Sequence, residues 1–391
     1  MAVQEIKPNV LAVGAKHWDR RLFDELIPLP DGTSYNSYLI QGSEKTALID
    51  TVEPEVNEQL FRNLEKAGVK KIDYIISNHA EQDHSGSLPD VLEKYPEAKV
   101  VTNPKCKTML QDLLPLKDDV FIVKDDEEEL SLGDKTLKFL LTPWVHWPET
   151  MSTYLKEDKI LFSCDFFGAH VAASKLFVQD EALVVEAAKR YYAEIMMPFR
   201  RKIRHNMKKV GEYDIDYIAP SHGQVYDKPE LIMDAYSDWI SADVKNEVVL
   251  PFVSMHGSTR KMVDHLIDAL TERNITVKPY SLTEGDLGDL AIDLVDAATI
   301  IIAAPTVLSG AHPEALYGAA LINALRPKTK YAGIIGSFGW GGLMEKQLGS
   351  MLNKLKVEYF DSVIIKGDPD KDNFKALDEL ADAIKAKHQE L

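Results

Sequence analysis

The strongest constraint on the fold is a regular alternation of apolar and helical segments after about residue 246. Short runs there are apolar throughout and rich in β-branched residues, and each is followed by a stretch with helical periodicity. Continuous apolar runs are typical of strands buried on both faces of a parallel sheet. The pattern therefore predicts a doubly wound, five-stranded parallel sheet with helices on both faces. The expected strands are Val248–Ser254, Thr276–Ser281, Thr299–Ala304, Tyr331–Ser337 and Ser362–Lys366, and the expected helices cover about 259–273, 287–297, 313–325, 341–356 and 371–388.

The preceding part of the chain has a different rhythm, with many β-type segments that Gly, Pro and Asp punctuate. Helical patterns at about 54–67, 86–95, 104–114 and 180–210 separate them without a strict strand–helix repeat. This mixed α/β pattern with many antiparallel strands predicts a first domain over 1–246 and a second over 247–391. The expected strands of the first domain are Asn9–Gly14, Ser34–Gln41, Lys45–Thr51, Ile72–Ser77, Lys99–Thr102, Thr136–Thr142, Met151–Leu155 and Lys159–Ser163.

The densest group of chemically active side chains lies directly after the apolar segment Tyr74–Ser77. His79, Glu81, Asp83 and His84 place potential metal ligands close together at the end of a predicted strand. Side chains two apart in an extended segment share a face, so His79 and Glu81 can converge on one ion. Where the chain turns into the following helix, Asp83 and His84 are expected to face a second ion.

Further candidate ligands occupy matching positions, because His146, Asp165 and His222 each follow a predicted strand. Together with the first group they supply imidazoles and carboxylates sufficient for two metal ions if one carboxylate bridges. A single buried His or Asp is usually a structural hydrogen-bonding group. A whole set in this order is much harder to explain in that way.

The order of these ligands resembles that of the metallo-β-lactamase superfamily, whose hydrolases carry HxHxDH at the first segment and bind zinc. Here Glu81 stands where those enzymes have the second histidine. A carboxylate in place of an imidazole adds negative charge and a harder donor, which favours iron or manganese over zinc. With HxExDH followed by a later His, Asp and His, the chain is identified as a member of the flavodi-iron protein family.

This resemblance implies an N-terminal metallo-β-lactamase-like αββα sandwich that holds two irons. It implies that one iron is bound by His79, Glu81 and His146, that the other is bound by Asp83, His84 and His222, and that Asp165 bridges the pair.

The resemblance also implies the activity, which is reduction of O₂ to water, of NO to N₂O, or of both. Electrons are expected from an external donor such as rubredoxin or an F420-type carrier, and they would pass through FMN. The family arrangement implies a head-to-tail homodimer, or a dimer of dimers, in which the FMN of one chain serves the irons of the other.

Three loops of the second domain are candidates for the flavin site. The loop that begins at Ser254 runs into a helix, where free backbone N–H groups and the helix dipole suit a phosphate, although Ser and Thr are also ordinary helix caps. The loops after the third and fourth strands would gather beside it at the carboxyl edge of the sheet. They resemble those of flavodoxin, hence FMN, and no GxGxxG follows a strand. The residues expected to contact FMN are Ser254, Met255, His256, Gly257, Ser258, Thr259, Pro305, Thr306, Val307, Leu308, Ser309, Gly310, Ser337, Phe338, Gly339, Trp340 and Gly341.

His170, Tyr191 and Tyr192 could line the di-iron pocket as proton donors, and a packing role is the alternative for each. The formal net charge of −17 disfavours nucleic acid as a partner. No apolar run is long enough to span a membrane, and the start shows no secretory signal. The two cysteines form no CxxC pair, which excludes a rubredoxin module and suits the cytoplasm.

Two other functions compete with the flavodi-iron interpretation. One is a dinuclear zinc hydrolase with an appended flavodoxin domain, which metal analysis would identify. The other is a non-enzymatic electron carrier with a vestigial metal site, which would consume neither O₂ nor NO.

Overall fold

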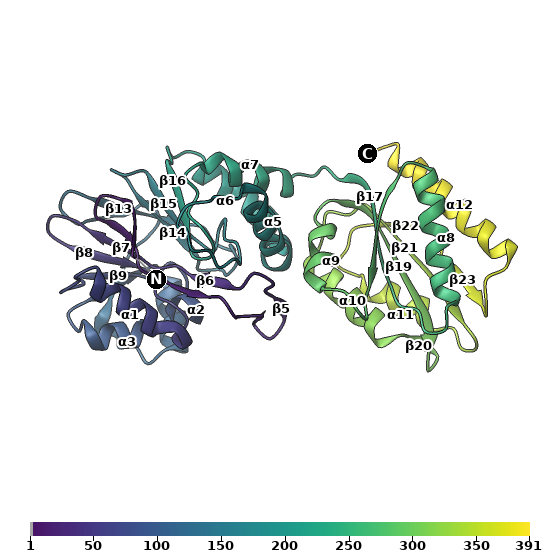
Figure 1. The fold of residues 1–391 in the computed structure, drawn as a ribbon, viewed down its shortest axis with the longest axis horizontal. Helices are drawn as coiled ribbons and strands as arrows, with labels where there is room; N and C mark the ends of the chain where they lie inside the picture. Colours follow the sequence, from purple (N-terminus) through teal and green to yellow (C-terminus); the bar gives the residue numbers. More distant parts are fainter. Residues whose placement is uncertain (1–2) are drawn as a thin grey trace. The chain divides into compact units, whose positions relative to one another are not determined.

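The computed structural model describes residues 3–391, and it shows two compact units (Figure 1). The first comprises the chain up to Tyr191 together with Phe199–Ile240. The second comprises Tyr192–Pro198 and Ser241–Leu391.

The second unit is built on a parallel sheet with the strand order β18-β17-β19-β21-β22, and β23 also pairs with β21. The first strand of the unit thus lies between the second and the third, which is the flavodoxin-like order. The predicted doubly wound parallel sheet is confirmed. The strands are β17 (Lys245–Phe252), β18 (Thr276–Ser281), β19 (Ala297–Val307), β21 (Tyr331–Phe338), β22 (Glu358–Tyr359) and β23 (Val363–Lys366), and the short β20 (Gly310–Ala311) pairs antiparallel with β19.

Helices cover both faces of this sheet. Figure 1 shows α8 and α12 on one face and α9, α10 and α11 on the other. The core on the first face includes Leu266 of α8, Ile301 of β19 and Ile384 of α12. The β-branched runs therefore form strands because both of their faces are buried against helices. The helices are α8 (Ser258–Glu272), α9 (Leu287–Leu294), α10 (Pro313–Leu325), α11 (Met344–Met351) and α12 (Lys371–His388).

The first unit contains two sheets packed face to face, with the orders β1-β2-β7-β8-β9-β10-β11 and β12-β13-β14-β15-β16. One core joins them, in which Ile76 and Val101 of the first sheet cluster with Phe139 and Phe162 of the second. The strands are β1 (Gln4–Lys7), β2 (Val10–Ala12), β7 (Tyr38–Gln41), β8 (Thr46–Ile49), β9 (Tyr74–Ile76), β10 (Lys99–Thr102), β11 (Phe121–Val123), β12 (Glu129–Ser131), β13 (Thr136–Leu141), β14 (Met151–Leu155), β15 (Ile160–Cys164) and β16 (Tyr217–Pro220).

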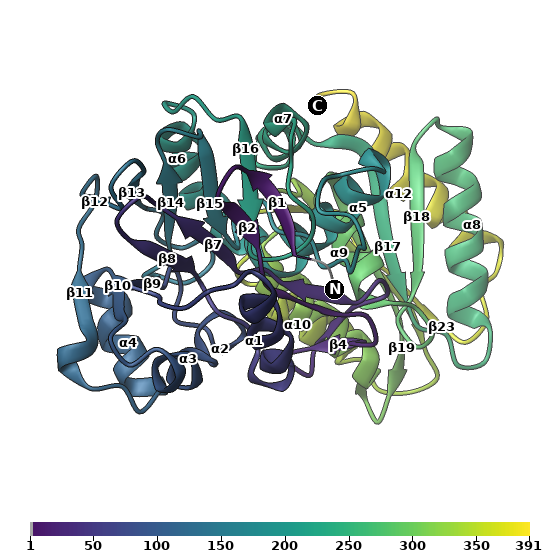
Figure 2. The same ribbon diagram turned by 60° about the vertical axis from the view of Figure 1, so that its left-hand side comes forward.

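Helices lie outside the two sheets, which completes the predicted metallo-β-lactamase-like αββα sandwich. Figure 2 shows α1, α3 and α4 along one side and α6 and α7 along the other. Two small hairpins, β3–β6 and β4–β5, extend from the first unit. The elements are α1 (Asn57–Lys66), α2 (Gln82–Ser85), α3 (Leu88–Lys94), α4 (Pro104–Leu113), α5 (Glu181–Tyr191), α6 (Arg200–Val210), α7 (Pro229–Trp239), β3 (Ala15–His17), β4 (Leu22–Phe23), β5 (Ile27–Pro28) and β6 (Thr33–Tyr35).

Some predicted elements are interrupted in the structure. The long helix expected over 180–210 is wrong, because π-helical and 3₁₀ turns over Tyr192–Phe199 separate α5 from α6. Pro198 lies in this break, and a proline removes a helical hydrogen bond and clashes with the preceding turn. The single strand expected over Ser34–Gln41 is divided into β6 and β7.

Within residues 3–391, no helix is both long and apolar enough to cross a membrane. Cys106 and Cys164 are buried, and neither forms a disulfide.

The structure predicts a pH dependence of folding that originates at His388 in the second unit. Its Nε2 lies 2.7 Å from Thr299 Oγ1, its Nδ1 lies 2.8 Å from Asn246 Oδ1, and burial lowers its pKa to about 4. An unfolded histidine binds a proton near pH 6.5. Between these two values the unfolded chain binds more protons than the folded one, so the free energy of unfolding falls as the pH falls. We expect His388→Gln to flatten this dependence between about pH 6.5 and 4, measured by urea denaturation.

The exposed His256 provides the control, because His256→Gln should leave the acid dependence as in the unaltered protein. Equal slopes in the His388→Gln variant and the unaltered protein would show that His388 does not contribute.

Candidate metal centre

All the predicted metal-ligating side chains lie in loops, or in one short helix, that follow strands of the sandwich. His79 and Glu81 follow β9, and α2 carries Asp83 and His84. His146 lies in the loop between β13 and β14. The remaining two, Asp165 and His222, directly follow β15 and β16. Neighbouring strand ends therefore bring residues that are far apart in sequence to one edge of the sandwich.

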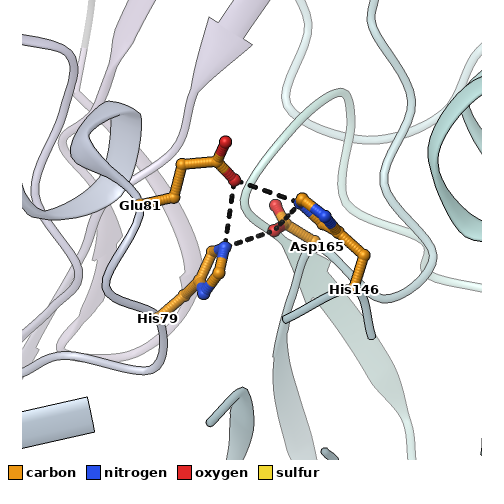
Figure 3. Close-up of side chains that lie close together, drawn as sticks. All are labelled: His79, Glu81, His146 and Asp165. Carbon is orange, nitrogen blue, oxygen red and sulfur yellow. Dashed lines mark hydrogen bonds and ion pairs between the residues drawn. The ribbon is translucent and has the colours of Figure 1, made fainter. Parts of the chain in front are cut away.

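The first group consists of His79, Glu81, His146 and Asp165, with candidate ligand atoms all within 4.8 Å of one another (Figure 3). Glu81 Oε2 lies 3.0 Å from His79 Nε2 and 3.0 Å from His146 Nε2. Both imidazoles also face Asp165 Oδ2, at 3.5 Å and 3.6 Å. Two nitrogen atoms and two oxygen atoms thus surround a single small volume.

The second group consists of Asp83, His84 and His222, again with candidate ligand atoms within 4.8 Å. Asp83 Oδ2 lies 3.2 Å from the Nε2 atoms of both His84 and His222. The two groups together contain every residue that we predicted from the sequence to bind metal.

Asp165 lies between the two groups and presents a different oxygen to each. Its Oδ2 faces the first group, whereas its Oδ1 lies 2.9 Å from His84 Nε2 and 3.5 Å from His222 Nε2. A carboxylate whose two oxygens point to separate clusters has the geometry that a bridging ligand requires. The residue is completely buried at the end of β15.

Several polar atoms of these groups have no hydrogen-bond partner in the part of the chain that the structure describes. They include both carboxylate oxygens of Asp83 and of Asp165 and both ring nitrogens of His84. Their close contacts are at ion-pair distance but lack hydrogen-bond alignment. Buried polar atoms without partners are costly, and buried charges are normally paired or coordinate metals. The donor set therefore fits two metal ions.

The electrostatics of the groups agree with this interpretation. Burial opposes charge on His79, but hydrogen bonds to Glu149 and Glu81 raise its pKa well above 6.5. Burial opposes charge on His222 too, but the nearby carboxylates of Asp165 and Asp83 raise its pKa to about 10. Without a metal, protons would have to compensate the carboxylates; a metal cation can replace them.

The atoms behind the imidazoles were not predicted from the sequence. His79 Nδ1 lies 2.6 Å from Glu149 Oε1, and His222 Nδ1 lies 2.7 Å from the carbonyl oxygen of Ser34. Such partners orient a ligating imidazole so that its other nitrogen faces the metal. Sequence spacing gives no sign of these contacts, because each joins loops that are remote in the chain.

Two of the three predicted proton-donor candidates lie beside the second group. The ring of His170 lies 4.7 Å from that of His222, its Nδ1 lies 2.9 Å from Thr33 Oγ1, and its Nε2 has no partner among the described residues. Tyr191 packs against both rings, at 4.8 Å and 5.7 Å. Tyr192 is buried in the following π-helical turn, which groups with the second unit.

The predicted flavin loops surround a cavity of about 230 Å³ in the second unit. The hydroxyls of Thr259 and Ser337 lie 3.0 Å apart at this cavity, and the buried Thr306 Oγ1 has no partner in residues 3–391. Hydroxyl groups on the residues that line a cavity are suited to a polar ligand. The lining residues are Met255, His256, Ser258, Thr259, Pro305, Thr306, Ser337, Phe338, Gly339 and Gly367, the last of which we did not predict.

The other residues of these loops do not line the cavity. Leu308 and Trp340 are 86% and 67% exposed, which leaves the indole available as a stacking surface. Gly257 has φ +97° and Gly341 has φ +81°, in the left-handed region where other residues are strained. The outcome for the remaining predicted contacts, Ser254, Val307, Ser309 and Gly310, stays a prediction.

Comparison with known proteins gives consistent matches along the chain. Residues 33–223 match the family described as ODP family beta lactamase. The coenzyme F420H₂ oxidase of Methanothermobacter marburgensis is 34% identical over 355 residues, which cover 87% of each chain. The nitric oxide reductase of Moorella thermoacetica is 33% identical over 360 residues, which cover 90% of each chain.

Solved structures extend the similarity to the complete fold. The rubredoxin oxygen:oxidoreductase of Desulfovibrio gigas has a TM-score of 0.95 at 30% identity, covering 99% of this chain and 98% of that one. The flavodiiron protein of Giardia intestinalis has a TM-score of 0.91 at 28% identity, with the same coverage.

The geometry of Asp165 predicts how metal binding responds to substitution. Asp165→Ala removes a donor from both groups, so we expect the affinity for both metals to fall at least about tenfold. His222→Ala removes a donor from the second group alone and should leave about one metal per chain. Metal content after loading with ferrous iron and dialysis against a chelator measures both outcomes.

Asp125 is exposed, and Asp125→Ala is the matched control that should keep two metals. If Asp165→Ala also kept two metals, Asp165 would not be a bridge.

Proposed function

Because this chain belongs to the flavodi-iron protein family, we propose that it reduces O₂ to water or NO to N₂O, using a non-haem di-iron centre and FMN. The observation that carries the proposal is the position of Glu81 between two imidazoles, beside the Asp165 carboxylate, whose two oxygens face the two separate groups. Oxygen-rich donor sets of this kind suit iron better than zinc.

The proposed ligands follow the two groups in the structure. His79, Glu81 and His146 would hold one iron, and Asp83, His84 and His222 would hold the other. Asp165, which faces both groups, would be the ligand that the two share. When bound, the iron pair and the reduced flavin hold four electrons, which reduce O₂ to two waters, whereas two NO require only two.

The protein contributes position, enclosure and charge. Glu81 and Asp83 each supply one negative charge to their own iron, and Asp165 shares a third between them. The rings of His170 and Tyr191 enclose His222, and the Thr33 hydroxyl fixes the orientation of His170. We propose these two rings as the surroundings of the reacting gas, and a role for either as proton donor, or for Tyr192, stays a prediction.

The proposed flavin site is formed by the three loops at the carboxyl edge of the second unit's sheet. The Thr259 and Ser337 hydroxyls, together with the backbone at the start of α8, are suited to the phosphate of FMN. The exposed Trp340 offers an aromatic surface to the ring system. In domain terms, residues 1–246 bind iron and residues 247–391 bind FMN.

Electrons come from an external donor. The names of the relatives point to F420H₂ in one case and rubredoxin in another, and two cysteines are too few for a rubredoxin module within this chain. We propose a donor of one of these two kinds, a cytoplasmic location, and a head-to-tail homodimer or dimer of dimers that pairs the FMN of one chain with the irons of the other.

A dinuclear zinc hydrolase is not favoured, because the named relatives are oxidases and reductases. A non-enzymatic electron carrier is disfavoured for the same reason, and because the ligand set is complete.

Anaerobic reduction of the purified protein followed by separate exposure to O₂ and NO tests the proposed activity. We expect two irons and one FMN per chain, and consumption of at least one gas at a rate that falls when the iron is removed. Oxygen and NO electrodes measure the rates. A protein that contains two zincs, or that consumes neither gas with iron and FMN bound, would contradict the proposal.

Replacing Glu81 by His tests why the centre takes iron. The Glu81→His variant has the HxHxDH pattern of the zinc enzymes and lacks one negative charge. We expect the preference for iron over zinc to fall at least about tenfold. Competition between the two metals, followed by metal analysis, measures the ratio. Glu55→His, at an exposed glutamate paired with Arg20, is the control and should keep the original preference.

A further inference from the structure

The two proposed metal positions are equivalent in the ligands that touch them. Each has two imidazoles and one carboxylate of its own, and each faces one oxygen of Asp165. The groups behind the ligands are therefore a source of difference between the two irons in this chain. Those groups are different on the two sides.

Behind the first position, Glu149 makes a short contact with His79. Its Oε1 lies 2.6 Å from His79 Nδ1, and both side chains are completely buried. Hydrogen bonds between a charged acceptor and an N–H group are shorter and about twice as strong as neutral ones. The negative charge of Glu149 therefore acts on the His79 imidazole from the side opposite the proposed metal.

Glu149 is itself held by its surroundings. The Ala80 amide donates to the same Oε1 at 3.1 Å, and Asn103 Nδ2 donates to the Glu149 carbonyl at 2.6 Å. Asn103 is anchored in turn, since its Oδ1 caps the start of α4. The ring of Trp147 packs edge-on against His79 at 4.9 Å. The carboxylate and the imidazole consequently have little freedom to separate.

Behind the second position, no carboxylate among the described residues makes a hydrogen bond with the Nδ1 of His84 or of His222. His222 Nδ1 faces the neutral carbonyl of Ser34 at 2.7 Å. His84 Nδ1 is buried and has no hydrogen-bond partner within residues 3–391. The Asp50 carboxylate acts on His84 without a hydrogen bond, so we expect the imidazoles on this side to be less electron-rich than His79.

We propose that Glu149 is a positioning residue, which holds His79 with Nε2 toward the first metal and makes that metal the electron-richer of the two. In the half-reduced pair, the ferric ion then occupies the first position and the ferrous ion the second. This inference rests on the proposed di-iron function. It concerns which of the two irons is reduced first, and the ligand set alone does not determine this order.

The test compares Glu149→Gln with the unaltered protein in a redox titration followed by electron paramagnetic resonance. Among the three charge states of the iron pair, only the half-reduced one has an odd electron count, so its signal, distinguished from that of the flavin radical, marks the potential range over which one iron is reduced. Gln keeps an acceptor for Nδ1 but removes the charge. We expect the preference of the ferric ion for the first position to fall about tenfold or more. The potential range over which the half-reduced pair exists then becomes narrower by about 59 mV for each tenfold change.

Asp50 provides the matched control. It is a buried carboxylate that accepts hydrogen bonds from the backbone and side chain of Asn78, next to His79, and its charge acts on His84 of the second group. Asp50→Asn should therefore leave the range at least as wide as in the unaltered protein. If both variants narrow the potential range equally, the range depends on nearby negative charge in general and not on the contact between Glu149 and His79.

A second measurement keeps the inference testable if Glu149→Gln folds poorly. Glu149→Asp keeps the charge but withdraws it from Nδ1 by one methylene, and we expect a narrower range and weaker iron binding at one position only. Chelator competition measures the affinities. Unchanged range and affinity in a folded variant of either kind would overturn the inference. An unaltered protein that binds no iron pair would instead overturn the proposed function.

Discussion

The structure depends on one concentration of buried charge, centred on Asp165 at the edge of the sandwich. Its two oxygens face separate groups of imidazoles, and no hydrogen-bond donor among the described residues satisfies them. A carboxylate in such a position is tolerated only with cations beside it. The surrounding loops are tied to one another through backbone hydrogen bonds, which include Met151 N to Asn78 O at 2.9 Å and Ser221 N to Cys164 O at 2.8 Å. The strands and the hydrogen bonds between their ends thus hold the metal-ligating residues in position.

The apolar core between the two sheets explains how the strands can hold buried polar ligands at their ends. Ile76 and Phe162, each close to the end of its strand, belong to the core between the two sheets, and a ligand follows three residues after each of them. Burial of such side chains favours folding by about 1.5–3 kcal/mol each. The core therefore stabilises the edge that carries the unsatisfied polar atoms. This division, an apolar layer within and ligands at the strand ends, is also what makes the ligands recognisable in the sequence.

The sequence predicted most where local patterns determine structure. The strand Thr276–Ser281 and the helices at 313–325 and 371–388 agree with the structure residue for residue, because apolar runs and helix signals coincide there. The ligating residues were predicted to be neighbours because strand ends meet at one edge. Glu149 and the Ser34 carbonyl were missed, since their contacts with His79 and His222 join residues 70 and 188 positions apart. No periodicity encodes such pairs. The break near Pro198 was visible in the sequence, but the helical pattern on both sides concealed it.

The difference between the ligands and the groups behind them also bears on whether a protein of this fold reduces O₂ or NO. The chain is almost equally similar to an F420H₂ oxidase and to a nitric oxide reductase, at 34% and 33% identity. Overall similarity therefore does not assign one gas. The ligands that members of a fold share determine which metal binds. Selectivity between two small gases depends instead on charge and space beyond the ligands. In this chain those features are the carboxylate behind His79 on one side and the rings of His170 and Tyr191 on the other. The two sides of the pocket can change independently, because within residues 3–391 no hydrogen bond of Glu149 involves either ring.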